Sequence, residues 1–197
     1  MNRNPLLKLY HAILACLLLQ ACSPASVRLV TPSAESEKNH LAAGIRVAEP
    51  ADNEAVIVIN NNAIGGTHAG LFAGHRLNDP AGSYVGKRSG NKDWTGPSLA
   101  DYVSFQREED GERILIYRFR LTPEDFNALD ARMSSTSPGL PLLCAVEVNN
   151  LIAGIGPFKA IENAGWTTPA SLAERLDQLL RQGHLPGECV MPDNQAC

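Results

Sequence analysis

Two side chains in this sequence, Cys144 and His68, are of types that can act together as a nucleophile and a base. Cys144 follows a loop that ends at Gly139 and Pro141, and the apolar stretch around it predicts a helix over residues 142–155. The first turn of a helix carries positive potential and unpaired N–H groups, which lower the pKa of a thiol and can bind an oxyanion. The alternative interpretation is a buried structural cysteine, because such a residue in an apolar helix would have the same local sequence.

His68 stands near the start of "THAGLFAG", a stretch that predicts a strand over residues 67–74. The two-residue period of a strand places His68, Gly70 and Phe72 on one face, and Gly70 leaves room beside the imidazole for another group. The alternative is that His68 is an ordinary core or edge residue. His75 would point to the opposite face, and no Cys/His spacing resembles a zinc motif, so the sequence predicts no metal site and no cofactor.

A third group would be needed to orient the imidazole, and the predicted strand over 75–82, "HRLNDPAG", offers two. Asp79 is the favoured partner, because a carboxylate can hold the His68 tautomer and stabilise the imidazolium. Asn78 is the second choice. A third possibility is that Asn78, Asp79 and Pro80 only form a turn.

The elements that would position these residues combine strand and helix patterns. Thr122 followed by Pro123, and Thr168 followed by Pro169, are typical of an N-cap with proline in the first helical position. Strands before most helices predict an α+β fold in one domain over residues 51–185. The predicted strands are 55–60, 67–74, 75–82 and 113–121; the predicted helices are 122–133, 142–155 and 167–183, and 96–110 is predicted as a helix start followed by a polar loop.

The N-terminus has the pattern of an export signal. Arg3 and Lys8 precede the apolar run 12–20, which is well short of the roughly 20 residues that span a bilayer. We therefore expect residues 1–21 to be a cleaved signal peptide.

The signal ends in "LLQAC", in which residues 19–21 before Cys22 resemble a bacterial lipobox. This resemblance implies cleavage before Cys22 and lipid modification of its side chain, and Ser23 after it points to the outer membrane, facing the periplasm. The Ser-, Ala- and Pro-rich residues 22–50 would then be a tether. The alternative is an ordinary signal peptide that happens to contain a cysteine.

The charge balance narrows the choice of partners. The chain has 17 Lys and Arg against 21 Asp and Glu, and loss of Arg3 and Lys8 with the signal leaves 15, a net charge of −6. An acidic surface argues against nucleic acid or anionic headgroups as the main partner. Membrane attachment would therefore come from the N-terminal lipid.

The cysteines suggest one disulfide and one free thiol. Export leads to a compartment where disulfides form, and Cys189 and Cys197 lie close together in the tail 186–197 with turn residues between them. With Cys16 removed in the signal peptide and Cys22 assigned to lipid, Cys144 is left as the free thiol.

The pattern "THAGLFAG…LNDPAG", followed by a cysteine at a helix start, resembles the circularly permuted papain-like hydrolases: the permuted NlpC-type enzymes and their lecithin retinol acyltransferase-like relatives. In that group a His-x-Gly-hydrophobic strand carries the base, the next strand an orienting residue, and a later helix the nucleophile. His68 matches the base and Cys144 the nucleophile. The five residues from Cys144 resemble the family's Cys-Ser-Glu-Leu-Val, with Ala145 replacing the serine. "TTPASLAERL" resembles its Thr-x-Pro-x-x-Leu segment, so the resemblance spans residues 56–182.

The resemblance implies a papain-like α+β fold, with a small antiparallel sheet packed against helices and the nucleophile at a helix N-terminus. It implies a membrane-anchored envelope cysteine hydrolase that cleaves an amide or ester bond, in a peptidoglycan peptide or a lipid acyl substrate, through a thioacyl intermediate. The alternative function is a non-catalytic lipoprotein that uses a papain-like cleft for binding or envelope assembly.

Overall fold

The computed structural model of the protein describes residues 44–63, 66–80, 82–92, 94–136 and 143–197. The predicted signal peptide, the predicted lipidation site Cys22 and most of the predicted tether lie outside this part of the chain, as do Gly139 and Pro141 of the loop predicted before Cys144.

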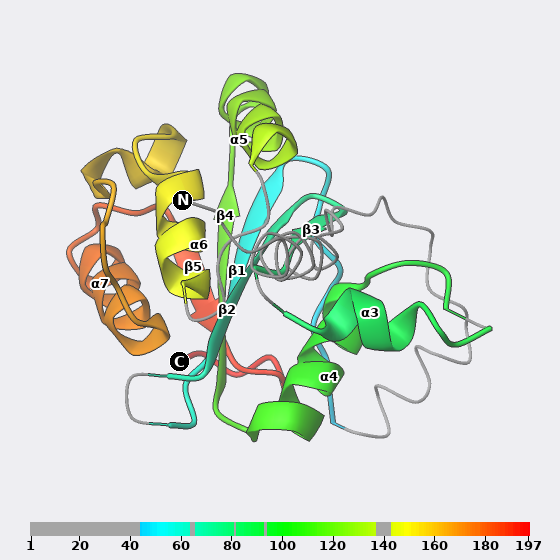
Figure 1. Cartoon of the computed structure of the whole chain (residues 1–197). Coiled ribbons are helices and arrows are strands. Elements are labelled where there is room, and N and C mark those ends of the chain that lie inside the picture. Colours follow the sequence, from blue (N-terminus) through cyan, green and yellow to red (C-terminus); the bar gives the residue numbers. More distant parts are fainter. Residues whose placement is uncertain (1–43, 64–65, 81, 93, 137–142) are drawn as a thin grey trace, which may run out of the picture.

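The described residues form an α+β structure around an open antiparallel sheet, and this confirms the predicted fold class at that level (Figure 1). The strand order is β3-β2-β1-β4-β5, so β1 is central and β3 and β5 are the edges. The strands are β1 (Glu54–Asn60), β2 (His68–Ala73), β3 (Arg76–Asn78), β4 (Ile114–Arg120) and β5 (Gly187–Val190).

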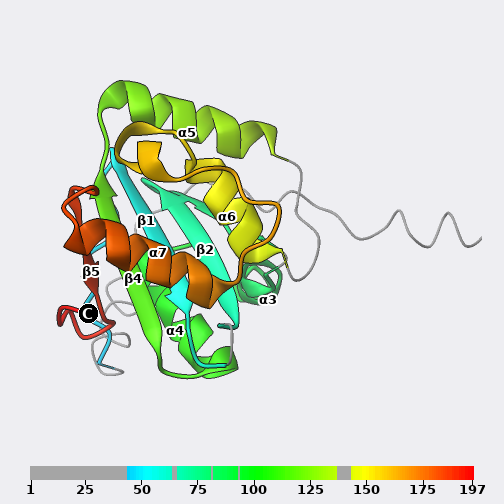
Figure 2. The ribbon, with the colours of Figure 1, turned by 90° about the vertical axis from the view of Figure 1, so that its left-hand side faces the viewer.

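Helices cover both faces of the sheet (Figures 1 and 2). On one face lie α5 (Pro123–Ser135), α6 (Cys144–Ile152) and α7 (Pro169–Arg181), with a short 3-10 helix η1 (Gly156–Ala160) after α6. On the other face lie α3 (Tyr84–Arg88) and α4 (Leu99–Asp110).

The alternation of side chains along the strands separates two apolar cores. In β1, Ile57 and Ile59 pack toward α5, α6 and α7, whereas Val56 and Val58 pack toward α3 and α4. Phe72 and Gly70 of β2 both face α4, so they share one face of the strand, as the two-residue period predicted. Because β1 is buried on both faces, its sequence is a continuous apolar run.

The predicted helix starts at Thr122 and Thr168 are confirmed, since each hydroxyl accepts a hydrogen bond from the backbone N–H three residues later. The prediction of a polar loop after the start of α4 was wrong. The helix continues to Asp110 because buried residues in its middle, including Phe105, hold it against the sheet. The helix α3 was not predicted.

The C-terminal tail belongs to the sheet, because β5 pairs with β4. The predicted disulfide between Cys189 and Cys197 is present, and it links β5 to the segment that folds back on it through a bridge between Val190 and Ala196. Among the described cysteines, Cys144 is the free one.

The segment that leads into the sheet, residues 44–50, is packed on the domain. Ile45 is buried, and the backbone N–H of Arg46 donates to the Pro192 carbonyl in the C-terminal tail. The Glu49 carboxylate accepts hydrogen bonds from the first backbone N–H groups of α4, at 2.7 and 3.2 Å. Arg118 of β4 donates to the carbonyl oxygens of residues 48 and 49. This end of the predicted tether is therefore part of the folded structure.

Candidate active site

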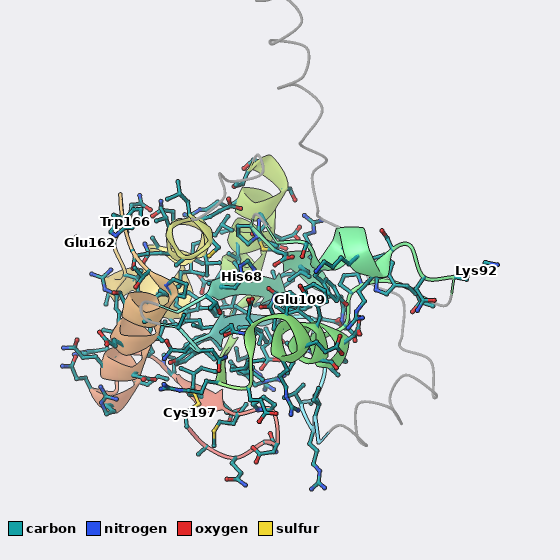
Figure 3. All side chains as sticks on the ribbon, turned by 60° about the horizontal axis from the view of Figure 1, so that its bottom comes forward. His68, Lys92, Glu109, Glu162, Trp166 and Cys197 are labelled. Atoms are coloured by element: carbon teal, nitrogen blue, oxygen red, sulfur yellow. A yellow bond between two sulfur atoms is a disulfide. The ribbon has the colours of Figure 1, made fainter. Side chains whose placement is uncertain are left out.

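The candidate site lies at the edge of β2, beyond the end of β3. The strand β3 pairs only with residues 71–73 of β2, so the edge at His68, Ala69 and Gly70 is left to other groups. The helix α6 packs at this edge and begins with Cys144. The Ala69 backbone N–H of β2 donates a hydrogen bond to the Cys144 sulfur. Figure 3 shows His68 near the centre of the molecule, away from Cys197.

The imidazole of His68 has a partner on each side. Its Nε2 lies 2.6 Å from Oδ1 of Asp79, and a second hydrogen bond joins the ring to Cys144. The Asp79 side chain is 1 % exposed and that of His68 13 %. The structure thus brings together the three side chains that the sequence indicated as candidates.

The electrostatics of the three groups favour charge separation between ring and sulfur. Burial disfavours a charged His68, but the hydrogen bonds and charges of Asp79 and Cys144 outweigh it and raise the pKa of His68 to about 10. Burial also opposes ionisation of Cys144. The hydrogen bond and charge of His68, followed by the N–H groups of Ala69 and Ala145, nevertheless lower the pKa of the Cys144 thiol. The directions of these two pKa shifts both favour a thiolate–imidazolium pair.

Cys144 is 6 % exposed and is the first residue of α6, as the sequence predicted for a cysteine in a first helical turn. The residue before it, Leu143, has no side chain that caps the helix. The Ala145 N–H is therefore directed at the sulfur instead of at a capping oxygen.

Asn78, the second choice for the orienting residue, has a different partner. Its Nδ2 donates to Oε1 of Glu147 in α6 at 3.1 Å. This bond links β3 to the helix that carries Cys144, so Asn78 contributes to holding the helix against the strand. The turn that was the third possibility also exists, because the Gly82 N–H donates to the Asp79 carbonyl at 3.1 Å. Asp79 therefore combines a turn with the contact to His68.

A polar cluster fixes the start of β2, and it was not found from the sequence. Asn60 pairs with His68 across the strands, and its buried Oδ1 accepts hydrogen bonds from Thr67 Oγ1 at 2.6 Å and from Asn62 Nδ2 at 2.7 Å. Its Nδ2 donates to the Gln106 carbonyl at 3.1 Å. The run of three asparagines at the end of an apolar strand was the available signal.

Gly66, from the double glycine before His68, lets α7 approach the start of β2. It has a φ of 77°, and a Cβ there would lie 2.7 Å from the Cβ of Pro169 and 2.9 Å from the Ala170 nitrogen. Both the backbone conformation and the close contact require glycine.

Tyr102 was also missed. This residue of α4 is fully buried, and its hydroxyl donates to Asp79 Oδ1 at 2.8 Å. The two-residue period of the strand indicated free space beside Gly70, and the phenol of Tyr102 occupies that space. The sequence contained no sign of which residue would fill it.

No protein-family model, curated protein or solved structure matches this chain. Within the described ranges, no group of three or more His, Cys, Asp or Glu side chains is placed to hold a metal ion. No helix in the same part of the chain is long and apolar enough to cross a membrane. The functional conclusion therefore rests on the geometry of the site, which brings a thiol, an imidazole and a buried carboxylate together.

Proposed function

We propose that this protein is a cysteine hydrolase of the permuted papain-like type, which cleaves an amide or ester bond through a thioacyl intermediate. The observation that carries the proposal is the His68 imidazole held between the buried Asp79 carboxylate and the Cys144 thiol. A histidine and a cysteine in this relation have the geometry of an activated nucleophile, and the third group orients the base.

In the proposed reaction the Cys144 thiolate attacks the substrate carbonyl carbon, and the carbonyl π electrons move onto oxygen. Collapse of this tetrahedral species expels the amine or alcohol, which takes the proton from the His68 imidazolium. In the second half, water attacks the thioester while His68 accepts a proton from it. The acid product leaves, and the thiolate–imidazolium pair is restored. Another acceptor in place of water would give acyl transfer.

The sequence features at the N-terminus complete the proposal. Lipidation at Cys22 would attach the enzyme to the outer membrane on the periplasmic side. A peptidoglycan peptide and a lipid acyl group are the two substrate classes within reach of such an enzyme. Release of amine from muropeptides, or of fatty acid from lipid, would distinguish them.

The first test is the pH dependence of Cys144 alkylation by iodoacetamide in the full chain, with Cys144→Ala as the blank and His68→Ala as the comparison. We expect the thiol to titrate well below the ordinary value of about 8.5, and to return toward that value in His68→Ala. A thiol that titrates normally and does not respond to His68 would contradict the enzyme and favour the non-catalytic binding lipoprotein.

A further inference from the structure

One carboxylate oxygen of Asp79 accepts two hydrogen bonds. Its Oδ1 accepts a hydrogen bond from His68 Nε2 at 2.6 Å and another from the Tyr102 hydroxyl at 2.8 Å. The other oxygen, Oδ2, is buried and has no hydrogen-bond partner in the described structure. Rotation about the Cβ–Cγ bond of Asp79 would bring either oxygen toward the imidazole. The hydrogen bond from the Tyr102 hydroxyl to Oδ1 opposes this rotation and keeps Oδ1 facing His68.

Two glycines make room for this arrangement. A Cβ on Gly70 would overlap with the Tyr102 hydroxyl oxygen and lie 2.9 Å from the ring carbon that bears it. A Cβ on Gly82 would overlap with the Asp79 carboxylate. Neither glycine has a positive φ, so the backbone conformation itself does not require glycine at either position. The requirement comes from the close approach of the hydroxyl and the carboxylate.

Tyr102 is itself held firmly. Its ring makes edge contacts with Tyr84, at 5.1 Å between ring centroids, and with Phe72 of β2, at 5.6 Å. The start of α4 is capped by Ser98 and by the carboxylate of Glu49. Burial, followed by the charge of Asp79, raises the pKa of Tyr102 well above its ordinary value, so the phenol stays protonated and remains a donor.

We propose that Tyr102 is a positioning residue of the site, because its hydroxyl holds Oδ1 of Asp79 toward His68. Gly70 leaves the space that this hydroxyl occupies. The inference rests on the proposed function, because it assigns Tyr102 a role in maintaining the thiolate–imidazolium pair. Tyr102 does not touch the reacting sulfur; it acts through Asp79.

The test compares two tyrosine substitutions in the same aromatic cluster. Tyr102→Phe removes the hydroxyl on Asp79, whereas Tyr84→Phe removes a hydroxyl that donates to Asp101 at 2.8 Å. Both keep their rings, so thermal unfolding should show folded proteins. A hydrogen bond to a charged group contributes enough for us to expect Cys144 alkylation near pH 6 to slow about tenfold in Tyr102→Phe, with the thiol titration moving up by about one pH unit. Tyr84→Phe should keep the wild-type profile.

The outcomes separate the two proposals. If the wild-type thiol titrates normally, the proposed hydrolase fails. If the wild type has a low thiol pKa and Tyr102→Phe has the same one, or a lower one, only the positioning role fails. An equal upward shift in both tyrosine variants would also refute it, because the effect would then come from the aromatic core.

A double-mutant cycle tests the role of Gly70. Gly70→Ala alone should slow alkylation at least tenfold, because the new methyl group displaces the hydroxyl from Asp79. In the Tyr102→Phe background the same change should cost much less, since no hydroxyl remains to be displaced. Additive effects of the two substitutions would contradict the assignment of Gly70.

Discussion

Replacing Asp79 with asparagine removes one negative charge beside His68 while keeping the size of the side chain. The Asp79–His68 pair is buried, with 2.6 Å between Oδ1 and Nε2. At a separation of about 4 Å between charge centres and an effective dielectric constant of about 20, the attraction is about 4 kcal/mol, or about three pKa units. This is comparable to the rise in the pKa of His68 from 6.5 to about 10, to which Cys144 also contributes.

We therefore expect Asp79→Asn to lower the pKa of His68 by about three units, and alkylation of Cys144 near pH 6 to slow at least tenfold. Titration of the His68 ring protons by NMR measures the first effect directly. The matched control is Asp101→Asn, since Asp101 is an acidic residue of α4 that accepts a hydrogen bond from Tyr84 instead. A His68 titration that is unchanged in Asp79→Asn would refute the ion pair as the source of the activated thiol.

Three further results are expected. Gly82→Ala should displace the buried carboxylate partner of His68 and slow low-pH alkylation about tenfold, whereas Gly86→Ala, whose Cβ meets nothing within 4 Å, should behave as wild type. Arg132→Ala should lower the free energy of unfolding in urea by about 2 kcal/mol, because the guanidinium donates to three carbonyl oxygens at the end of α6, at 2.8, 2.9 and 3.1 Å. Cys144→Ala removes the thiol, whose lowered pKa would make the folded state more stable as pH rises. In this variant the free energy of unfolding should therefore fall as pH rises above about 6.5, because native His68 keeps a proton that the unfolded chain has lost. A urea midpoint that is flat from about pH 6 to pH 9 would contradict this.

The part of the site that sequence predicted best depends on local patterns. The period of β2 placed His68 and Gly70 on one face, and the apolar run from Leu142 onward predicted a helix that has Cys144 in its first turn. Such patterns follow from backbone geometry alone. They also led to Asp79, which directly follows β3 and contacts His68.

What the sequence did not predict depends on contacts between distant elements. Tyr102 lies on α4 and reaches Asp79 only because the helix packs over the sheet, and no spacing within α4 marks Tyr102 as a partner of Asp79. The length of α4 was underestimated for a similar reason: its polar residues suggest a loop, but burial of Phe105 against the sheet keeps it helical. The strand β5 is short, and it is a strand because β4 offers it an edge.

The attachment of residues 44–50 determines where a shortened form of the protein must begin. Composition places the start of the domain at residue 51, but cutting there would remove the carboxylate of Glu49 that satisfies the first N–H groups of α4. It would also remove Ile45 from the core that surrounds Tyr102. Loss of residues 44–50 would therefore weaken the packing of α4, the helix whose Tyr102 contacts Asp79. A soluble form that begins at Ser23 would keep the contacts of Ile45 and Glu49. The unit that folds cooperatively therefore begins before β1.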